Sequence, residues 1–198
     1  MYPHSVMFHH FHDDFHPKSQ GSIDKNQLEE ILDFLQNNFN LIGADLFSRK
    51  IAESSLENND VVLSFDDALK CQFDIAVPIL EKRKISAFFF IYSSPFKGNP
   101  DMLEVYRLFR NNYYKNVNFF YDDFFKKAKI YKDNYNILYR SFLKTDFLKK
   151  YKFYSLEDRW FRFLRDRVLG YSLYTKIMES LMREKKFIKE NFYEKLWM

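Results

Sequence analysis

Two adjacent carboxylates, Asp66 and Asp67, directly follow an apolar run at residues 61–65. A continuous apolar run of this length is typical of a buried strand in a parallel sheet. Ligands of parallel sheets bind at the carboxyl ends of the strands, and two neighbouring acids favour a bound cation or a shared proton. The pair is therefore a candidate for a metal ligand beside a general base. The alternative is that one aspartate only caps the helix that follows.

The histidines form a second cluster, because all 5 of them lie within the first sixteen residues. If the apolar segment at residues 6–11 is a strand, His10 and His12 share one face and His9 lies on the other. Imidazole binds metals and transfers protons near neutral pH, so these three side chains are candidates to line a substrate pocket. The alternative is an exposed N-terminal segment with adventitious metal affinity.

Several other kinds of site are excluded by the sequence. No predicted helix contains His-x-x-x-His, no Cys-x-x-Cys occurs, and the 4 glycines form no phosphate-binding loop.

The single cysteine, Cys71, cannot form an internal disulfide and indicates a reducing, cytoplasmic location. The N-terminus does not look like a secretory signal, and no apolar run approaches the ~20 residues of a membrane span.

The two halves of the chain differ in composition. Residues 1–100 contain 9 Lys and Arg against 14 Asp and Glu, whereas residues 101–198 contain 22 against 13. A basic, aromatic half could stack on and neutralise a nucleic acid. However, its acids are mixed with the bases and its aromatics recur at helical spacing, so we expect a helical core with lysines on the solvated face. No nucleic-acid partner is expected.

The hydrophobic patterns predict two structural regions. Strands are expected at residues 6–11, 61–65 and 86–92, and helices at 25–38, 44–56 and 70–84, with Pro78 perturbing the last. Strand, helix and strand in this order indicate a parallel α/β portion over residues 1–98. Residues 99–198 are expected to form a helical subdomain, with helices at 101–114, 119–132, 136–149, 155–168 and 171–192.

Three segments together resemble the polysaccharide deacetylase family. Asp60-Val-Val-Leu-Ser-Phe-Asp-Asp-Ala68 is similar to a family strand that ends in Thr/Ser-Phe-Asp-Asp. Ile85-Ser-Ala-Phe-Phe-Phe-Ile91 resembles the strand that follows it, and Val6-Met-Phe-His-His10 resembles the family's opening strand. The sequence from Phe8 to Ile23 is similar to deacetylase-like proteins of bacterial surface-sugar pathways. The resemblance covers roughly residues 5–95.

The resemblance implies a fold, a reaction and roles for individual residues. The fold is a partial deformed (β/α) barrel carrying a long helical insertion or C-terminal helical subdomain. The reaction is metal-dependent hydrolysis of N-acetyl groups on sugars, with a divalent metal, usually zinc, as cofactor and an N-acetylated sugar or glycan as substrate. By position, Asp66 is the general base, Asp67 is a metal ligand, and His9 lines the pocket.

The sequence departs from the family pattern in two places. Ala68 stands where many members have glycine, and no histidine follows His16, so the family's later His-x-x-x-His and its general-acid histidine are missing. We therefore expect an incomplete site with little activity, an apolar strand that lacks cover, and self-association or a second chain that completes the barrel. Two alternatives stay open: a non-catalytic sugar-binding or interaction module, and a Mg²⁺-dependent phosphoryl-transfer domain.

Overall fold

The computed structural model describes residues 2–187 and 192–198. The chain divides into two compact units, which are described separately. The first contains the chain up to Leu108 and the C-terminal segment from Phe192 on, and the second begins at Phe109. The first unit therefore extends beyond residue 98, where the composition of the chain changes.

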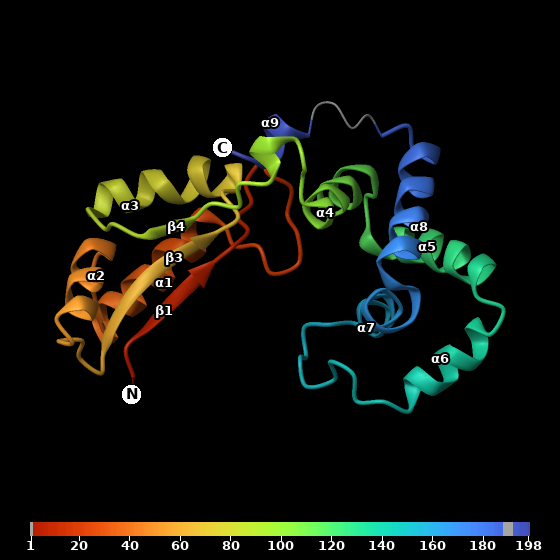
Figure 1. Ribbon diagram of the computed structural model, residues 1–198, viewed down its shortest axis with the longest axis horizontal. Coiled ribbons are helices and arrows are strands. Elements are labelled where there is room, and N and C mark those ends of the chain that lie inside the picture. The colour runs from red at the N-terminus through yellow and green to blue at the C-terminus, as the bar shows by residue number, and fades with distance from the viewer. Residues whose placement is uncertain (1, 188–191) are drawn as a thin grey trace. The chain divides into compact units, whose positions relative to one another are not determined.

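The first unit contains one sheet of parallel strands: β1 (His4–Phe8), β2 (Asn40–Leu41), β3 (Asp60–Asp66) and β4 (Phe88–Phe90). β3 is the central strand, and its residues are buried up to Phe65. β1 pairs along one side of it, while β2 and β4 pair with the start and the end of its other side (Figure 1). The carboxyl ends of β1, β3 and β4 consequently lie at one edge of the sheet.

Figure 1 shows α1 (Lys25–Asn38), α2 (Ala44–Ala52) and α3 (Val77–Arg83) beside the strands of this sheet. The first unit also contains the π-helix η1 (Gln72–Ala76), the 3-10 turn η2 (Pro95–Lys97), the start of α4 (Met102–Tyr113) and α9 (Tyr193–Leu196). Asp24 and Gln27 form a capping box at the start of α1. Arg83 of α3 forms ion pairs with Glu29 and Asp33 of α1, which ties these two helices together.

The second unit is helical and has an aromatic core. Its helices are α5 (Val117–Tyr131), α6 (Tyr135–Leu143), α7 (Leu156–Phe163), the π-helix η3 (Leu164–Leu169) and α8 (Gly170–Glu184). Phe124 of α5 lies at the centre, with its ring 4.8 Å from that of Phe161 and 6.1 Å from that of Tyr174. None of the described helices is both long enough and apolar enough to span a membrane.

The mixed α/β fold with parallel strands is confirmed, whereas the barrel remains a prediction. The strand predicted at residues 61–65 is β3, and the helix at 25–38 is α1 with the same bounds. The strand predicted at 6–11 is shifted, because pairing with β3 ends at Phe8 and the chain then leaves the sheet. The strand at 86–92 is shortened to β4, and the two-residue β2 was not predicted.

Several predicted helices end early or change type. The predicted helix at 70–84 contains a π-helical segment just before Pro78, whose missing N–H and bulky ring disturb the regular hydrogen-bond ladder. α2 ends at Ala52, α6 at Leu143 and α8 at Glu184, each earlier than predicted. Residues 188–191 of the helix predicted at 171–192 lie outside the described part of the chain.

Candidate active site

The two adjacent carboxylates lie in a tight turn at the end of β3. Asp66 is the last residue of the strand, and Asp67 and Ala68 have φ angles of 70° and 52°. A left-handed backbone conformation favours glycine, and aspartate tolerates it better than alanine does. The N-cap of the following η1 is Cys71 rather than an aspartate. Helix capping therefore does not explain the acidic pair.

His9 follows β1 and faces this turn. Its Nε2 atom lies 2.8 Å from Oδ2 of Asp67. The side chain of His9 is 32% exposed and that of Asp67 is 26% exposed. Since a carboxylate oxygen accepts, Nε2 of a neutral His9 carries the proton and Nδ1 keeps its lone pair. The parallel pairing of β1 with β3 brings the two residues together, because it places the ends of both strands at the same sheet edge.

His10 contacts a residue that the sequence reasoning did not identify. Its Nε2 atom lies 2.8 Å from Oε2 of Glu104, which is in the first turn of α4 and whose side chain is only 4% exposed. Arg107, one turn further along α4, donates from Nη1 to Nδ1 of His10 at 2.6 Å and lies 3.5 Å from Oε1 of Glu104. Glu104 is therefore a buried carboxylate with an imidazole and a guanidinium as partners.

Burial and charge set the protonation states of this pair. Burial lowers the pKa of His10 below its ordinary value, in spite of the opposing effect of Glu104. Burial alone would raise the pKa of Glu104, but the hydrogen bond from His10 and the charge of Arg107 hold it below its ordinary value. A neutral imidazole therefore donates to an ionised carboxylate at neutral pH.

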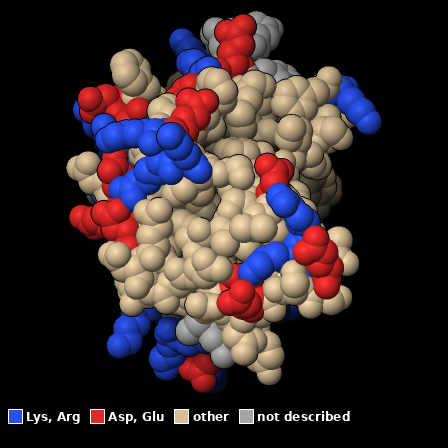
Figure 2. All heavy atoms as spheres, turned by 90° about the vertical axis from the view of Figure 1, so that its left-hand side faces the viewer, with Lys and Arg blue, Asp and Glu red and all other residues tan. Residues whose placement is uncertain are grey.

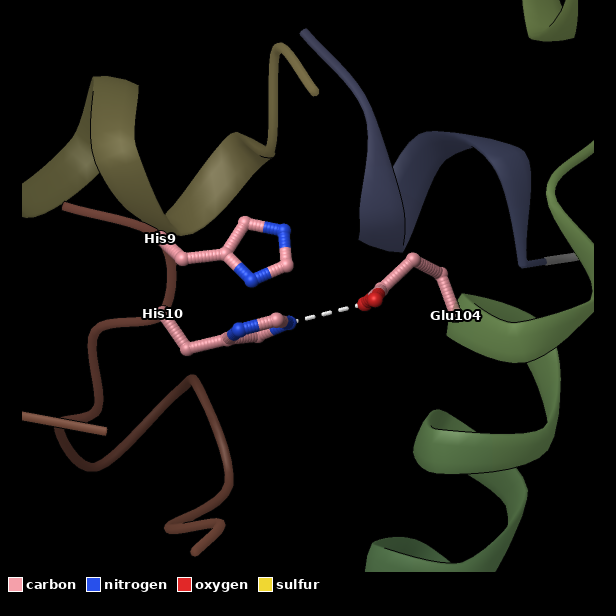
Figure 3. A group of neighbouring side chains, drawn as sticks. All are labelled: His9, His10 and Glu104. Carbon is pink, nitrogen blue, oxygen red and sulfur yellow. Dashed lines mark hydrogen bonds and ion pairs between the residues drawn. The ribbon is translucent and has the colours of Figure 1, made fainter. Parts of the chain in front are cut away.

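His9, His10 and Glu104 together form a group that could bind a metal. Each offers one donor atom, and these atoms all lie within 4.8 Å of one another. Figure 3 shows the two histidines, which are adjacent in the chain, and Glu104 from α4 converging on the same space. Two imidazoles and a carboxylate are a common ligand set of catalytic zinc sites.

Gln72 fixes the two segments that carry these side chains. It is fully buried, and its Nε2 donates to the carbonyl oxygens of His9 at 2.8 Å and of Asp66 at 2.6 Å. The end of β3 and the segment after β1 are thereby held by one amide. Gln72 was also missed by the sequence reasoning, although a polar residue between the apolar Leu69 and Ile75 is a signal for such a role.

Two other candidates lie outside the group. Nδ1 of His12 forms a hydrogen bond with the Ser22 hydroxyl at 2.9 Å. His12 is not part of the group formed by His9, His10 and Glu104. The expected alternation of His10 and His12 on one strand face is wrong, because residues 9–12 follow β1 and are not part of it. Cys71 is buried, and burial raises the pKa of its thiol to about 11, so it is no thiolate nucleophile at neutral pH.

A cavity of about 660 Å³ adjoins the acidic turn. The backbone N–H of Met198 donates to the carbonyl oxygen of Ala68 at 3.2 Å, and Leu69 forms an antiparallel bridge with Trp197. These contacts connect the turn with the cavity wall. The cavity is lined by Lys70, Pro95, Phe96, Glu194, Trp197 and Met198.

Comparisons with known proteins give partial structural matches. No family model and no curated protein matches the chain. One similar structure is described as a de-N-acetylase from Aggregatibacter actinomycetemcomitans, with 26% identity and a TM-score of 0.38 over 46% of this chain and 38% of that one. Another, IcaB from Ammonifex degensii, has 24% identity and a TM-score of 0.39 over the same shares. The chain thus spans 38% of the length of these proteins.

Proposed function

We propose that this chain is a polysaccharide deacetylase-like protein whose chemistry is the metal-dependent hydrolysis of N-acetyl groups on sugars. The observation that carries the proposal is the acidic pair at the end of β3 with His9 bound to it, Nε2 of His9 lying 2.8 Å from Oδ2 of Asp67. The resemblance of the β1, β3 and β4 sequences to deacetylase strands supports the same function.

The donors at this sheet edge fit a divalent transition metal. Asp67, His9, His10 and Glu104 together offer two imidazoles and two carboxylates, a set that suits zinc better than Mg²⁺, which prefers oxygen ligands. When bound, such an ion polarises the amide carbonyl and acidifies a water molecule. The presence of two histidines therefore argues against the Mg²⁺-dependent phosphoryl-transfer alternative.

Asp66 is assigned as the general base of the proposed reaction. Its carboxylate accepts a proton from the water that attacks the acetamido carbonyl. The carbon–nitrogen bond then breaks as the nitrogen takes this proton back from Asp66, and acetate and the amino sugar are released. Gln72 supports this role, because its hydrogen bond to the Asp66 carbonyl fixes the backbone that carries the base.

The cavity beside the turn is the proposed place for the sugar. Phe96 and Trp197 offer apolar ring faces, and Lys70 and Glu194 offer polar groups that can bind hydroxyls. A mostly apolar, concave site with few polar groups is the usual character of small-molecule pockets. We expect N-acetylglucosamine oligomers to bind here with the acetamido group directed to Asp66 and Asp67.

The proposal is tested by incubating the chain with N-acetylglucosamine oligomers and Zn²⁺ or Co²⁺ and measuring released acetate and free amine. The missing later histidines predict little activity, whereas the donor atoms of His9, His10 and Glu104 provide metal ligands from within the chain. We therefore expect release that the Asp66→Asn variant abolishes, while the Asp74→Asn variant, which changes another aspartate of the same unit, retains it. Oligomer binding measured by calorimetry without any release would instead establish the non-catalytic sugar-binding module. Absence of both binding and release would refute the proposed function.

A further inference from the structure

The position of Glu104 beside the two histidines indicates a metal site that the motifs did not contain. We propose that the nitrogen atoms of His9 and His10 and the carboxylate of Glu104 bind the divalent ion, and that Asp67 orients His9 instead of binding the metal itself. This inference extends the proposed function by assigning the ligands from within the chain. It differs from the assignment of Asp67 as a ligand that the family resemblance implies.

The hydrogen bond between His9 and Asp67 carries the first step of the argument. Nε2 of His9 donates to Asp67 at 2.8 Å, so the lone pair of a neutral ring is on Nδ1. Histidines that bind metals usually donate their other ring N–H to a carboxylate, which fixes the tautomer and strengthens the ligand. Asp67 has this relation to His9, and His9 in turn lies next to His10, with their ring centroids 4.1 Å apart.

The pair of His10 and Glu104 carries the second step. Nε2 of His10 donates to Oε2 of Glu104 at 2.8 Å, and a metal ion would take the place of the hydrogen between these two atoms. The proton would then move to Nδ1 of His10, which keeps the ring neutral. The side chain of Glu104 is only 4% exposed, so its charge requires a cation beside it, which Arg107 provides now and a bound ion would provide in its place.

Arg107 is the present cation of the site, and it would have to move. Its Nη1 lies 2.6 Å from Nδ1 and 2.8 Å from Nε2 of His10, so an ion bound at Nε2 would meet the guanidinium charge at close range. Its side chain is 31% exposed, so the guanidinium can turn toward solvent while Glu104 stays in place. Arg107 thus competes with the metal for the same carboxylate, and its removal should strengthen metal binding.

The experiment measures metal binding by the full chain, independently of activity. The metal-free protein is titrated with Co²⁺, whose visible absorption reports nitrogen and oxygen ligands, and Zn²⁺ affinity is obtained by displacing Co²⁺. We expect one ion per chain, loss of the signal in Glu104→Gln, and a roughly 10–100-fold weaker affinity in Asp67→Asn, as for the loss of an orienting carboxylate. Arg107→Gln should bind more tightly than the unaltered chain.

His16 provides a matched control, because it also pairs with a carboxylate, Asp74, at 2.9 Å, and among the described residues this pair is not part of a group of three metal donors. His16→Ala should leave Co²⁺ binding unchanged, and circular dichroism of each variant checks its folding. Unchanged binding in Glu104→Gln, or no gain in Arg107→Gln, would overturn the inference. If only Asp67→Asn abolishes binding, Asp67 is itself a metal ligand; this inference is then wrong and the proposed function is unaffected. If the variants change Co²⁺ binding as expected but the chain does not hydrolyse the amide, the proposed function is refuted and this inference remains valid.

Discussion

The site contains two pairs of a histidine and a carboxylate that differ in their surroundings. His9 and Asp67 are both partly open to solvent, whereas the side chains of His10 and Glu104 are 13% and 4% exposed. Solvent screens the first pair, so its hydrogen bond mainly fixes the orientation of the ring. The buried pair is poorly screened by solvent, and removing His10 would leave the carboxylate of Glu104 without its hydrogen-bond donor.

Gln72 is the residue whose loss should affect the site without changing its charge. In Gln72→Leu, the part-buried carbonyl oxygens of His9 and Asp66 each lose the donor that Nε2 now provides. We expect the free energy of unfolding to fall by roughly 2–3 kcal/mol, because buried acceptors that lose their donors are destabilising. Urea denaturation measures this change.

Gln36 is the control for this substitution, since it is an exposed glutamine of α1 whose hydrogen bond from Arg83 is open to solvent. Gln36→Leu should change the free energy of unfolding by less than about 0.5 kcal/mol. Equal stability of the Gln72→Leu variant and the unaltered chain would show that Gln72 does not hold the two segments.

Residue types allowed part of the site to be predicted. Asp66, Asp67, His9 and His10 stand out in the sequence, because two acids directly follow an apolar run and the histidines are clustered near the N-terminus. Glu104 does not stand out, since it is one of 27 acidic residues and meets His10 across 94 positions of sequence. Only the folded arrangement makes that contact visible.

Among the elements, β3 determines where the site lies, and its first residue is firmly anchored. Asp60 is fully buried and accepts hydrogen bonds from Nζ of Lys50 and from the backbone N–H of Glu57, both at 2.8 Å, and from Asn40. Burial alone would raise the pKa of Asp60, but these three donors hold it below its ordinary value of 3.8. β3 is thereby tied to α2 and β2 at its start.

The lowered pKa of Asp60 predicts a pH dependence of stability. The native state favours the ionised carboxylate, so its contribution is fully present above the unfolded pKa and is lost as the pH falls through the folded pKa, below 3.8. Asp60→Asn should therefore be less stable than the unaltered chain at pH 7, and the difference should shrink as the pH approaches 3. Urea denaturation across this pH range measures it, with the exposed Glu53→Gln as control. A difference that does not depend on pH would contradict this account.

Elements with strong local signals were predicted closely, and elements that depend on pairing were not. The capping box of Asp24 and Gln27 defines the start of α1, and its bounds are as predicted. β1 was placed too late, because its register is set by β3 and not by its own apolar residues. The two-residue β2 has no pattern of its own and exists through its contacts with Asp60 and Val61.

At the scale of the whole molecule, the first unit leaves apolar side chains exposed at its last strand. Phe90, Ile91 and Tyr92 are 57%, 64% and 43% exposed. Figure 2 shows a face on which charged side chains lie around a broad area without Lys, Arg, Asp or Glu. Exposed apolar groups near an open strand favour association, so we expect the chain to self-associate or to bind a second chain.

Replacing one of these side chains should reduce self-association. Ile91→Lys places a charge beside the end of β4, where a partner would otherwise cover apolar surface. Ile130→Lys is the matched control, since Ile130 is 74% exposed on α5 in the second unit. Sedimentation velocity over a range of concentrations should show oligomers that Ile91→Lys weakens and Ile130→Lys does not. A monodisperse monomer of the unaltered chain would refute the expectation and indicate that β4 needs no cover.

The site joins segments that are far apart in the chain, which has a kinetic consequence. His9 meets Asp67 across 58 positions and His10 meets Glu104 across 94, so two long loops must close before the donors meet. Contacts of such separation carry a large closure entropy and tend to form late in folding. An ion that binds only the completed site would then leave the folding rate unchanged and slow unfolding in proportion to its concentration. The metal would thus stabilise the native chain after it has folded, rather than direct its folding.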